Sequence, residues 1–543
     1  MSDSNVRNHQ SMWAPLSVPL FRALWLAATF SNIGTFMQDV GAAWLMTSLT
    51  ISPVMVALMQ TATYLPFFML SLPAGALADL VDRRMLLIVG QGWMLVAALA
   101  LGCLTYFHIV GPWWLLTFTF MLGIGNAISA PAWNASTPEL VPRDKLEPAI
   151  ALGGLSYNVS RGLGSALGGL IVAAAGPAAV FLLNALSFIA VIYVVSKWKH
   201  KPIDQGERIF GAMRAGVRYV RHSPALVSVM VRSSVFAACS AAMWALLPLI
   251  GREQIKLDSI GYGLLLSIFG IGCIIGAFVL PILRRSLSLD HLNSAGNLLF
   301  AVALVTLGLS RHFAIASLAM LEAGTAWIVV NSSMNTAAQM AIPSWVRARA
   351  MSVYILVFQG SVAIGSLLWG QIASTKGGLT VALVIAAGTM CLNLILALRY
   401  KLGMVENFDT SMSPHWKDPN LVHEPSPDHG PVLVTVEYII DPAKAKEFTE
   451  AASVLGKVRR RDGAYQWHLF FDLARPERYF ETFMIESWGE HVRQHERVMK
   501  ADKLVEDRVN VFHVGGKPMV VHHLISAYST DTIPVTAQNQ LRH

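Results

Sequence analysis

Charged residues are scarce in this sequence. Asp, Glu, Lys and Arg make up only 14% of its 543 residues, and 54% of the residues are hydrophobic, whereas soluble domains carry about 25% charged residues. This composition argues against a water-soluble fold and indicates that lipid is the solvent. The net charge of +8 does not indicate nucleic-acid binding, because the basic residues lie between apolar runs rather than on one face of a helix.

Cysteine is scarce as well. The four cysteines lie in apolar stretches, and none belongs to a close pair of the kind that binds zinc: Cys103, Cys239, Cys273 and Cys391. We interpret them as packing residues. Neither a cofactor nor a metal site is therefore predicted from the cysteines.

Long apolar runs, by contrast, fill most of the chain. Twelve of them are long enough, at about 1.5 Å per residue, to cross a hydrocarbon core of roughly 30 Å. They lie at 20–48, 54–79, 85–107, 112–134, 147–174, 177–196, 225–250, 259–283, 292–310, 313–337, 349–375 and 379–400. We therefore predict an all-α polytopic membrane protein with twelve transmembrane helices, six on each side of a long polar connector.

The distribution of Lys and Arg predicts how these spans are oriented. Connectors after even-numbered spans hold fifteen Lys and Arg residues, whereas connectors after odd-numbered spans hold four. Because basic loops stay in the cytoplasm, both termini are predicted to be cytoplasmic and the protein to lie in the cytoplasmic (inner) membrane. The first span continues beyond the length of a signal-peptide core, so we expect it to stay attached.

The two sets of six spans resemble each other. A shift of 201 positions, without any gap, pairs identical residues in both halves, including Gly75 with Gly276, Arg83 with Arg284, Pro142 with Pro343, Gly164 with Gly365 and Gly169 with Gly370. Such a register is expected for two parallel six-helix repeats. Repeats of this kind place a substrate cavity at their interface near the middle of the membrane and alternate its access by rocking.

The chain after the last span has a different character. Alternating and helical patterns predict a βαββαβ unit of the ferredoxin-like type, with strands near 432–438, 465–471, 479–487 and 509–514 and helices near 442–458 and 488–503. The expected parts of the whole chain are an N-terminal tail (1–19), a six-helix bundle (20–196), a cytoplasmic linker (197–224), a second bundle (225–400), a second linker (401–430), the ferredoxin-like domain (431–525) and a disordered tail (526–543).

A sequence motif ends the second span. It reads Gly75-Ala76-Leu77-Ala78-Asp79-Leu80-Val81-Asp82-Arg83-Arg84. Here the chain resembles the major facilitator superfamily, whose loop between helices two and three has a glycine, an acidic residue and paired basic residues. The resemblance implies a gating latch: Gly75 lets helices approach, Asp79 faces a helix N-terminus of the other half, and Arg83 with Arg84 anchors the loop by ion pairs.

The alternative for this motif is a plain basic loop. Asp82 stands where the superfamily commonly has a second glycine, and the corresponding site of the second half has Leu280 in place of the acid. Only the first-half latch is therefore complete.

The fifth span is rich in glycine around Asn158 and Arg161. It resembles the glycine-rich helix five of export-type facilitators, which favours export over import. A charge at this depth needs an acidic or polar partner. Arg161 is therefore either a structural ion-pairing residue or a contact for an anionic substrate or a coupling carboxylate.

Two carboxylates lie inside predicted spans. Asp39 follows Asn32 and Thr35 on a polar stripe of the first span, and Glu322 lies in the tenth. A carboxylate that gains and loses its charge in the membrane suits a reversible proton carrier. We predict proton coupling or substrate binding for both, and the alternative is a neutralised or Arg-paired structural group.

A cavity for an organic molecule combines aromatic walls with a few polar anchors. Further residues of the spans fit this description and are predicted to line it: Asn32, Gln38, Gln60, Asn126, Trp133, Trp244, Asn331, Asn335 and Gln359.

The C-terminal domain holds two histidines, His491 and His495, four residues apart on a predicted helix. Without a third ligand we do not predict a metal site. The domain resembles the ferredoxin-like units of antibiotic-biosynthesis monooxygenases, which usually dimerise through their sheets. It shows no haem or flavin motif, so we predict an interaction or regulatory role, with pairing into a homodimer, rather than catalysis.

Nearly the whole chain resembles a facilitator subgroup of transmembrane secretion effectors related to siderophore exporters, including Ser31-Asn32-Ile33-Gly34-Thr35-Phe36-Met37-Gln38 in the first span. The resemblance implies a proton-driven exporter of a small organic molecule and not an enzyme. Two alternatives stay open: a membrane-tethered sensor or assembly platform, and an oxygenase-like enzyme acting through the C-terminal domain.

Overall fold

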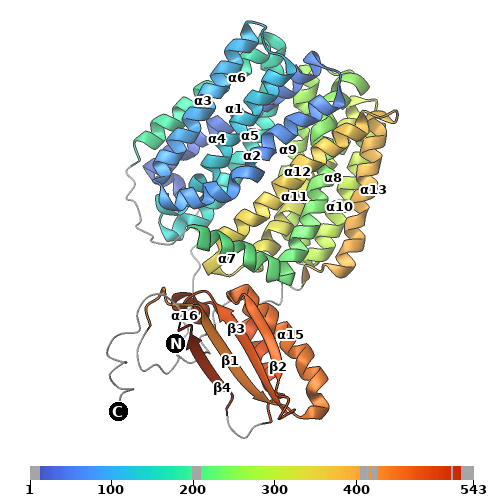
Figure 1. Cartoon of the computed structure of the whole chain (residues 1–543). Helices are drawn as coiled ribbons and strands as arrows, with labels where there is room; N and C mark the ends of the chain where they lie inside the picture. The colour runs from blue at the N-terminus through green and yellow to red at the C-terminus, as the bar shows by residue number, and fades with distance from the viewer. Residues whose placement is uncertain are drawn as a thin grey trace, which may run out of the picture. The chain divides into compact units, whose positions relative to one another are not determined.

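A computed structural model of the chain describes residues 13–198, 209–403, 413, 416, 425–514 and 518–527. Twelve helices of 20 or more residues form in these ranges (Figure 1). The first six are α1 (Pro19–Leu49), α2 (Pro53–Leu80), α3 (Arg83–Tyr106), α4 (Pro112–Leu140), α5 (Leu146–Ala175) and α6 (Pro177–Ser196). The last six are α8 (Pro224–Leu249), α9 (Ser259–Leu283), α10 (Leu289–Leu309), α11 (Phe313–Met340), α12 (Arg347–Ala373) and α13 (Gly378–Arg399). The predicted twelve-helix architecture is confirmed.

Ten of the described helices are long and apolar enough to cross a membrane. The two long helices outside this set are α1 and α5. They carry Asp39 and Arg161. Reduced apolarity is tolerated where a helix lines an internal space instead of lipid, because polar groups then find water or protein partners. The polar character of α1 and α5 therefore indicates where a central site lies.

Several helix ends follow from local sequence. Proline opens α1, α2, α4 and α6, where its missing N–H costs nothing. The side chain of Asp82 caps α3 by accepting a hydrogen bond from the backbone N–H of Arg84, and Asp258 caps α9 in the same way through Gly261. These caps fix the turns at which the chain re-enters the bundle.

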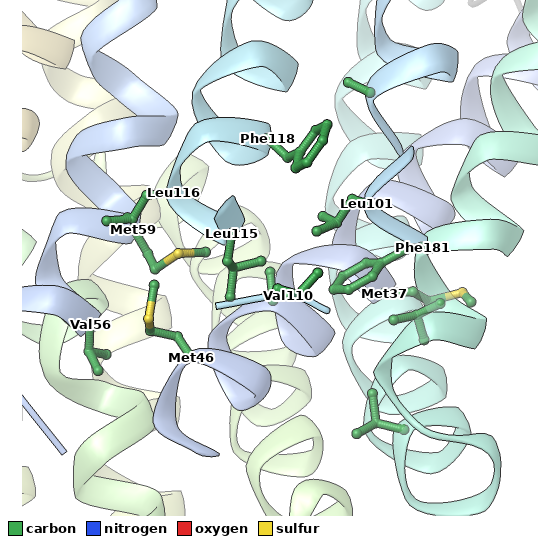
Figure 2. Packing of buried hydrophobic residues seen from close by; sticks show 14 of the residues in the cluster. Met37, Met46, Val56, Met59, Leu101, Val110, Leu115, Leu116, Phe118 and Phe181 are labelled. Atoms are coloured by element: carbon green, nitrogen blue, oxygen red, sulfur yellow. The ribbon is translucent and has the colours of Figure 1, made fainter. Parts of the chain in front are cut away.

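Apolar residues close one end of the bundle, the end at which α1 joins α2. Figure 2 shows this cluster, in which the ends of α1, α3 and α5 meet the beginnings of α2, α4 and α6. Its buried members include Met46, Leu115 and Phe181, and Leu249 joins them from α8 of the second half. The two halves therefore share one hydrophobic core at this end, called here the α1–α2 end. The opposite end is called the α2–α3 end.

The second half holds a fully buried arginine. Arg232 of α8 pairs with Asp290 at the start of α10. It also donates to Asn293 Oδ1 at 2.9 Å. Asn393 of α13 donates to Asn297 Oδ1 at 2.9 Å and to the carbonyl of Arg232 at 3.0 Å. This network joins α8, α10 and α13, and because a buried charge requires such partners, we interpret Arg232 as a structural residue.

The chain forms a second compact unit from residues 210–227, 337–351 and 404–543. The predicted linker 197–224 contains a helix, α7 (Ile209–His222), which belongs to this unit. Within the unit, the Tyr219 hydroxyl donates to the Ala341 carbonyl at 2.8 Å, and Arg218 pairs with Glu490 at 3.2 Å. The connector between the two halves is therefore an ordered, partnered helix in its described part.

The C-terminal part of this unit contains a four-stranded antiparallel sheet with the strand order β2-β3-β1-β4. The elements are β1 (Val432–Ile439), α15 (Ala445–Asp462), β2 (Gln466–Phe471), β3 (Arg478–Ile485), α16 (Trp488–Arg497), α17 (Lys500–Asn510) and β4 (Val520–Ile525). Alternate residues of β1 are buried, and they pack with Phe448 and Leu455 of α15 and Val509 of α17.

The predicted element order agrees with this domain except at its end. The strand predicted at 509–514 is wrong, because residues 500–510 form α17, and the fourth strand lies at 520–525. Val509 and Phe512 pack into the core of the domain, which a helix satisfies as well as a strand. The predicted tail 526–543 lies outside the described residues except at 526 and 527.

Candidate transport site

Helix α5 of the first half packs closely against α9 of the second half at the centre of the bundle. A Cβ on Gly270 would lie 3.1 Å from Cα of Gly162, and one on Gly263 would lie 2.5 Å from the carbonyl oxygen of Ser165. The Ser267 hydroxyl also donates to the Gly162 carbonyl at 2.9 Å. The glycines of the fifth span therefore bring the two halves into backbone contact, next to Arg161.

Arg161 lies among aromatic rings from both halves. Its guanidinium carbon is 5.4 Å from the ring centroid of Phe36 and 5.2 Å from that of Tyr157. From the second half, the rings of Trp244 and Phe269 are both 5.7 Å away. The Tyr157 hydroxyl accepts a hydrogen bond from Nη2 at 3.3 Å. We call Arg161 and these four rings the aromatic cage; it holds the charge by cation–π attraction.

Asp39 lies on α1, one helical turn after Phe36. It interacts electrostatically with Arg161, Tyr64 and Tyr262, which come from three other helices. It makes no ion pair within 4 Å among the described residues. Its side chain is nevertheless exposed. A residue surrounded by α2, α5 and α9 can be exposed only to a space inside the bundle, so Asp39 faces an internal space beside the aromatic cage.

Further rings extend the aromatic wall in the second half. The ring centroid of Trp327 of α11 lies 5.7 Å from that of Trp244 and 6.3 Å from that of Phe269. It lies 6.4 Å from the ring centroid of Phe358 of α12. The predicted residue Gln60 donates to the Trp244 carbonyl at 3.5 Å, across the two halves. Trp244 is among the residues predicted from the sequence, whereas Phe269 and Trp327 are not. The sequence signals that could have selected these two residues are their aromatic side chains and their position in the second six-helix repeat.

The predicted cavity-lining residues are dispersed. Asn32 and Trp133 line a separate cavity of about 80 Å³ within the first half, between α1, α3, α4 and α5. Gln38 is buried and accepts a hydrogen bond from Asn184 of α6 at 2.7 Å. Its side chain therefore joins two helices of one half instead of lining the central space. The amide of Asn331 donates to the Trp327 carbonyl of its own helix at 3.0 Å.

The remaining predicted residues are not brought to the cage by any described contact. Asn126 and Asn335 are exposed, and Gln359 and Glu322 are half-buried. Among the described residues, Glu322 has neither an ion pair nor a hydrogen bond with Arg161. Of the two predicted carboxylates, Asp39 is the one for which an interaction with the arginine is observed.

The loop motif is anchored within the first half. Arg83 forms an ion pair with Glu139 at the end of α4. Arg84 donates to the Ser196 carbonyl at the end of α6, at 2.5 Å. The sequence analysis did not name Glu139. The side chain of Asp79 lies outside the described residues.

Gly75 and the second-half motif complete this end of the bundle. A Cβ on Gly75 would lie 3.7 Å from Oγ of Ser352, which belongs to α12 of the other half. In the second half, Arg284 donates to the Ser332 carbonyl at 3.2 Å and to the Thr336 hydroxyl at 2.9 Å. The repeat places Met340 where the first half has Glu139. The second-half loop is therefore held by hydrogen bonds from the Arg284 guanidinium to neutral acceptors instead of an ion pair.

Contacts between the halves shield the cage from the α1–α2 end. Arg252 donates a hydrogen bond to the Thr47 hydroxyl at 3.1 Å. The ring of Trp44 stacks on that of Tyr262, with 5.9 Å between the ring centroids. Towards the α2–α3 end, a Cβ on Gly153 or Gly154 would meet no atom within 4 Å. The open side of Gly153 faces the cavity of about 80 Å³ within the first half.

The chain matches known transporters over most of its length. The family model for transmembrane secretion effectors matches residues 10–531. The staphyloferrin A transporter of Staphylococcus aureus is 23% identical over 370 residues, which is 67% of this chain and 92% of that protein. The enterobactin exporter EntS of Escherichia coli is 24% identical and covers 72% of this chain and 95% of the exporter. The macrolide efflux protein A of Streptococcus pyogenes is 21% identical, with 53% of this chain and 73% of that protein covered.

Solved structures show the same fold. A POT family transporter in complex with 5-aminolevulinic acid has a TM-score of 0.60 at 13% identity, covering 71% of this chain and 96% of that one. A bacterial homolog of the lysosomal transporter Spinster, inward-facing and unoccupied, has a TM-score of 0.55 at 14% identity, covering 72% and 96%. The chain thus belongs to the transmembrane secretion effectors of the major facilitator superfamily, and it is a multi-pass inner-membrane transporter and not an enzyme.

Proposed function

We propose that this transporter exports a small organic molecule by proton antiport and alternating access, and that Asp39 and Arg161 form its central site. The observation that carries the proposal is the aromatic cage, to which both halves contribute rings. A group held by both halves changes its surroundings whenever the halves rock, as alternating access requires.

The cage suits a substrate with an anionic group and flat or apolar parts. A guanidinium binds carboxylate or catecholate oxygens through two parallel hydrogen bonds, and the rings contact the rest of the molecule. The staphyloferrin A transporter and the enterobactin exporter are relatives of this chain. We propose a substrate of this broad class, an anionic and amphiphilic metabolite.

Asp39 provides the coupling step. As a carboxylate, it accepts hydrogen bonds from hydroxyl or amine groups of the substrate, while Arg161 binds the anionic group. Protonation of Asp39 removes its negative charge and turns one acceptor oxygen into a donor, which weakens binding, so the proton and the substrate compete for one site. Competition of this kind gives antiport, because each side of the membrane exchanges one for the other.

The orientation predicted from the Lys and Arg distribution makes the α2–α3 end cytoplasmic. Contacts at Thr47–Arg252 and Trp44–Tyr262 then close the outer side of the site. On this proposal, the outer side of the site is the closed side. Gly75, Asp79, Arg83 and Arg84 would act as the gate that closes the cytoplasmic side during turnover.

Proton flux in inverted vesicles tests the function. Vesicles that contain the full chain and a pH-sensitive dye receive staphyloferrin A, enterobactin or a macrolide in separate runs. Transport of a probe should release protons from energised vesicles, and Asp39→Asn should abolish this coupling. Glu322→Gln is the matched control, because it neutralises a carboxylate that lies outside the aromatic cage. Unchanged transport and unchanged pH dependence in Asp39→Asn would remove Asp39 from the mechanism.

A role for the C-terminal domain as a sensor or assembly platform is the second proposal. The domain contacts α7 through Arg218 and Glu490, and Arg497 stacks on Trp345 between α11 and α12 at 4.4 Å. Arg218 and Trp345 belong to the same compact unit as the C-terminal domain, and they lie in the segments of chain that connect it to the long helices. If cells without the gene showed the same internal and external metabolites as wild-type cells, this function would replace export.

Pairing of two C-terminal domains is proposed to occur through the open sheet face. Phe470, Val520 and Leu524 are exposed large apolar side chains on this sheet. Chemical crosslinking of the full chain in membranes tests it, with Leu524→Lys expected to reduce the dimer.

A further inference from the structure

Three histidines of the C-terminal domain converge. His491 and His495 lie one turn apart on α16, and β4 brings His523 beside them. One ring nitrogen of each lies within 4.8 Å of those of the other two. The ring centroid of His491 is 4.8 Å from that of His495 and 4.8 Å from that of His523. The sequence shows only the helical pair, because the third residue lies on a strand that the patterns placed elsewhere.

The central histidine lacks hydrogen-bond partners. His491 is 1% exposed, and both of its ring nitrogens are buried without a partner among the described residues. The amide oxygen and nitrogen of Gln494, fully buried one turn away, are unpartnered as well. Buried polar groups in folded proteins nearly always have partners, and each exception needs an explanation such as an unseen ion.

The surroundings keep the ring of His491 neutral. Burial is the main cause that lowers its pKa to about 3, and the neighbouring His495 and His523 contribute to the same lowering. A neutral imidazole with a free lone pair is the form that binds metal ions. Trp488 packs against this group, with its ring centroid 5.4 Å from that of His491 and 6.4 Å from that of His523.

We propose that His491, His495 and His523 bind a divalent transition-metal cation, with Zn²⁺ as the reference ion. Three imidazoles suit zinc, copper, iron or nickel and leave a further coordination position open. At metal–nitrogen distances of about 2.0–2.1 Å, the nitrogens lie roughly 3.3 Å apart. Rotation of the side chains brings the observed nitrogens to that spacing.

Gln494 has a supporting role in this site. A histidine bound to metal through one ring nitrogen usually donates a hydrogen bond through the other, which fixes the ring. The unpartnered amide oxygen of Gln494 is the acceptor available to His491. With Gln494 beside one ring nitrogen of His491, a cation would give the other buried ring nitrogen a partner.

Metal content of the full chain tests the site. The protein is purified in detergent through a tag without histidine, stripped with a chelator, incubated with Zn²⁺, Fe²⁺, Cu²⁺ or Ni²⁺ and desalted. Elemental analysis should find about one cation per chain. His523→Ala should abolish retention, and Gln494→Ala should weaken affinity by about 10- to 100-fold.

The matched control is His522→Ala. His522 precedes His523 on the same strand and therefore points to the opposite face of the sheet. Binding of Co²⁺ should give a visible absorption spectrum in wild type and in His522→Ala and lose it in His523→Ala, and thermal unfolding shows whether each variant is folded. The proposal is overturned if no cation is retained by the wild-type chain, or if a folded His523→Ala binds as tightly as His522→Ala.

Discussion

Replacing Arg161 by lysine keeps the positive charge of the central site but removes the planar guanidinium group. The guanidinium contacts four rings at 5.2–5.7 Å, and each such contact contributes about 0.5–1 kcal/mol. An ammonium is a point charge that faces one ring at a time, and it cannot bind two oxygens of an anion in parallel. Losing two or three contacts costs about 1–3 kcal/mol.

This cost corresponds to a rise of about 5- to 150-fold in the concentration of probe that gives half-maximal proton flux. The assay is the flux measurement in inverted vesicles, with the probe varied at constant pH. Arg161→Met should weaken transport of an anionic probe more than Arg161→Lys, because it also removes the charge. Arg399→Lys, an exposed substitution at the end of α13, serves as the control.

Equal behaviour of the lysine and methionine variants would show that the positive charge of Arg161 does not contribute to binding of the anionic probe. An unchanged half-saturation concentration in Arg161→Lys, with unchanged protein amount in the membrane, would equally refute the role of the aromatic cage. The remaining explanation would then be a structural one.

Three further predictions concern packing and charge. Gly263→Ala should lower transport and thermal stability, because its Cβ would lie 2.5 Å from the Ser165 carbonyl, whereas Gly388→Ala, with no atom within 4 Å, should leave both unchanged. Arg459→Met should destabilise the C-terminal domain by about 3–5 kcal/mol in chemical unfolding, because it removes the cation that contacts the two buried carboxylates of Glu481 and Glu506, and loss of less than about 1 kcal/mol would contradict the buried network. Burial alone would raise the pKa of Glu490, but the nearby arginines lower this pKa below 4.5. The stability that Glu490 contributes is therefore present above its unfolded pKa and is lost as the pH falls through the lower pKa of the folded state. Unfolding of wild type below about pH 4.5 should therefore depend on pH more steeply than that of Glu490→Gln, and parallel curves would contradict this assignment.

The helices could be predicted from the sequence because lipid imposes a length and an apolarity on each span. The bounds of α6 and α9 agree with the predicted runs at both ends. Arg161 and Asp39 could be found because a charge inside a span is costly and therefore conspicuous. Local patterns also predicted β1 and α15, whose apolar residues face a single core.

Long-range partners could not be predicted. Nothing near Arg161 in the sequence indicates that Trp244 and Phe269 of the other half would contact it. Gln38 looked like a cavity residue because it is polar, but its partner Asn184 lies on another helix. The third histidine was missed for a related reason, since tertiary packing turned an alternating segment into α17 and moved the last strand.

The two loops that end α2 and α9 will respond differently to ionic strength. The first is held partly by the ion pair between Arg83 and Glu139, whose side chains are 19% and 23% exposed. Dissolved salt screens such a pair, and the Debye length falls to about 8 Å at physiological concentration. The second is held by hydrogen bonds from Arg284 to a carbonyl and a hydroxyl, which salt screens less. Raising the salt concentration should thus loosen one half of the twofold body before the other.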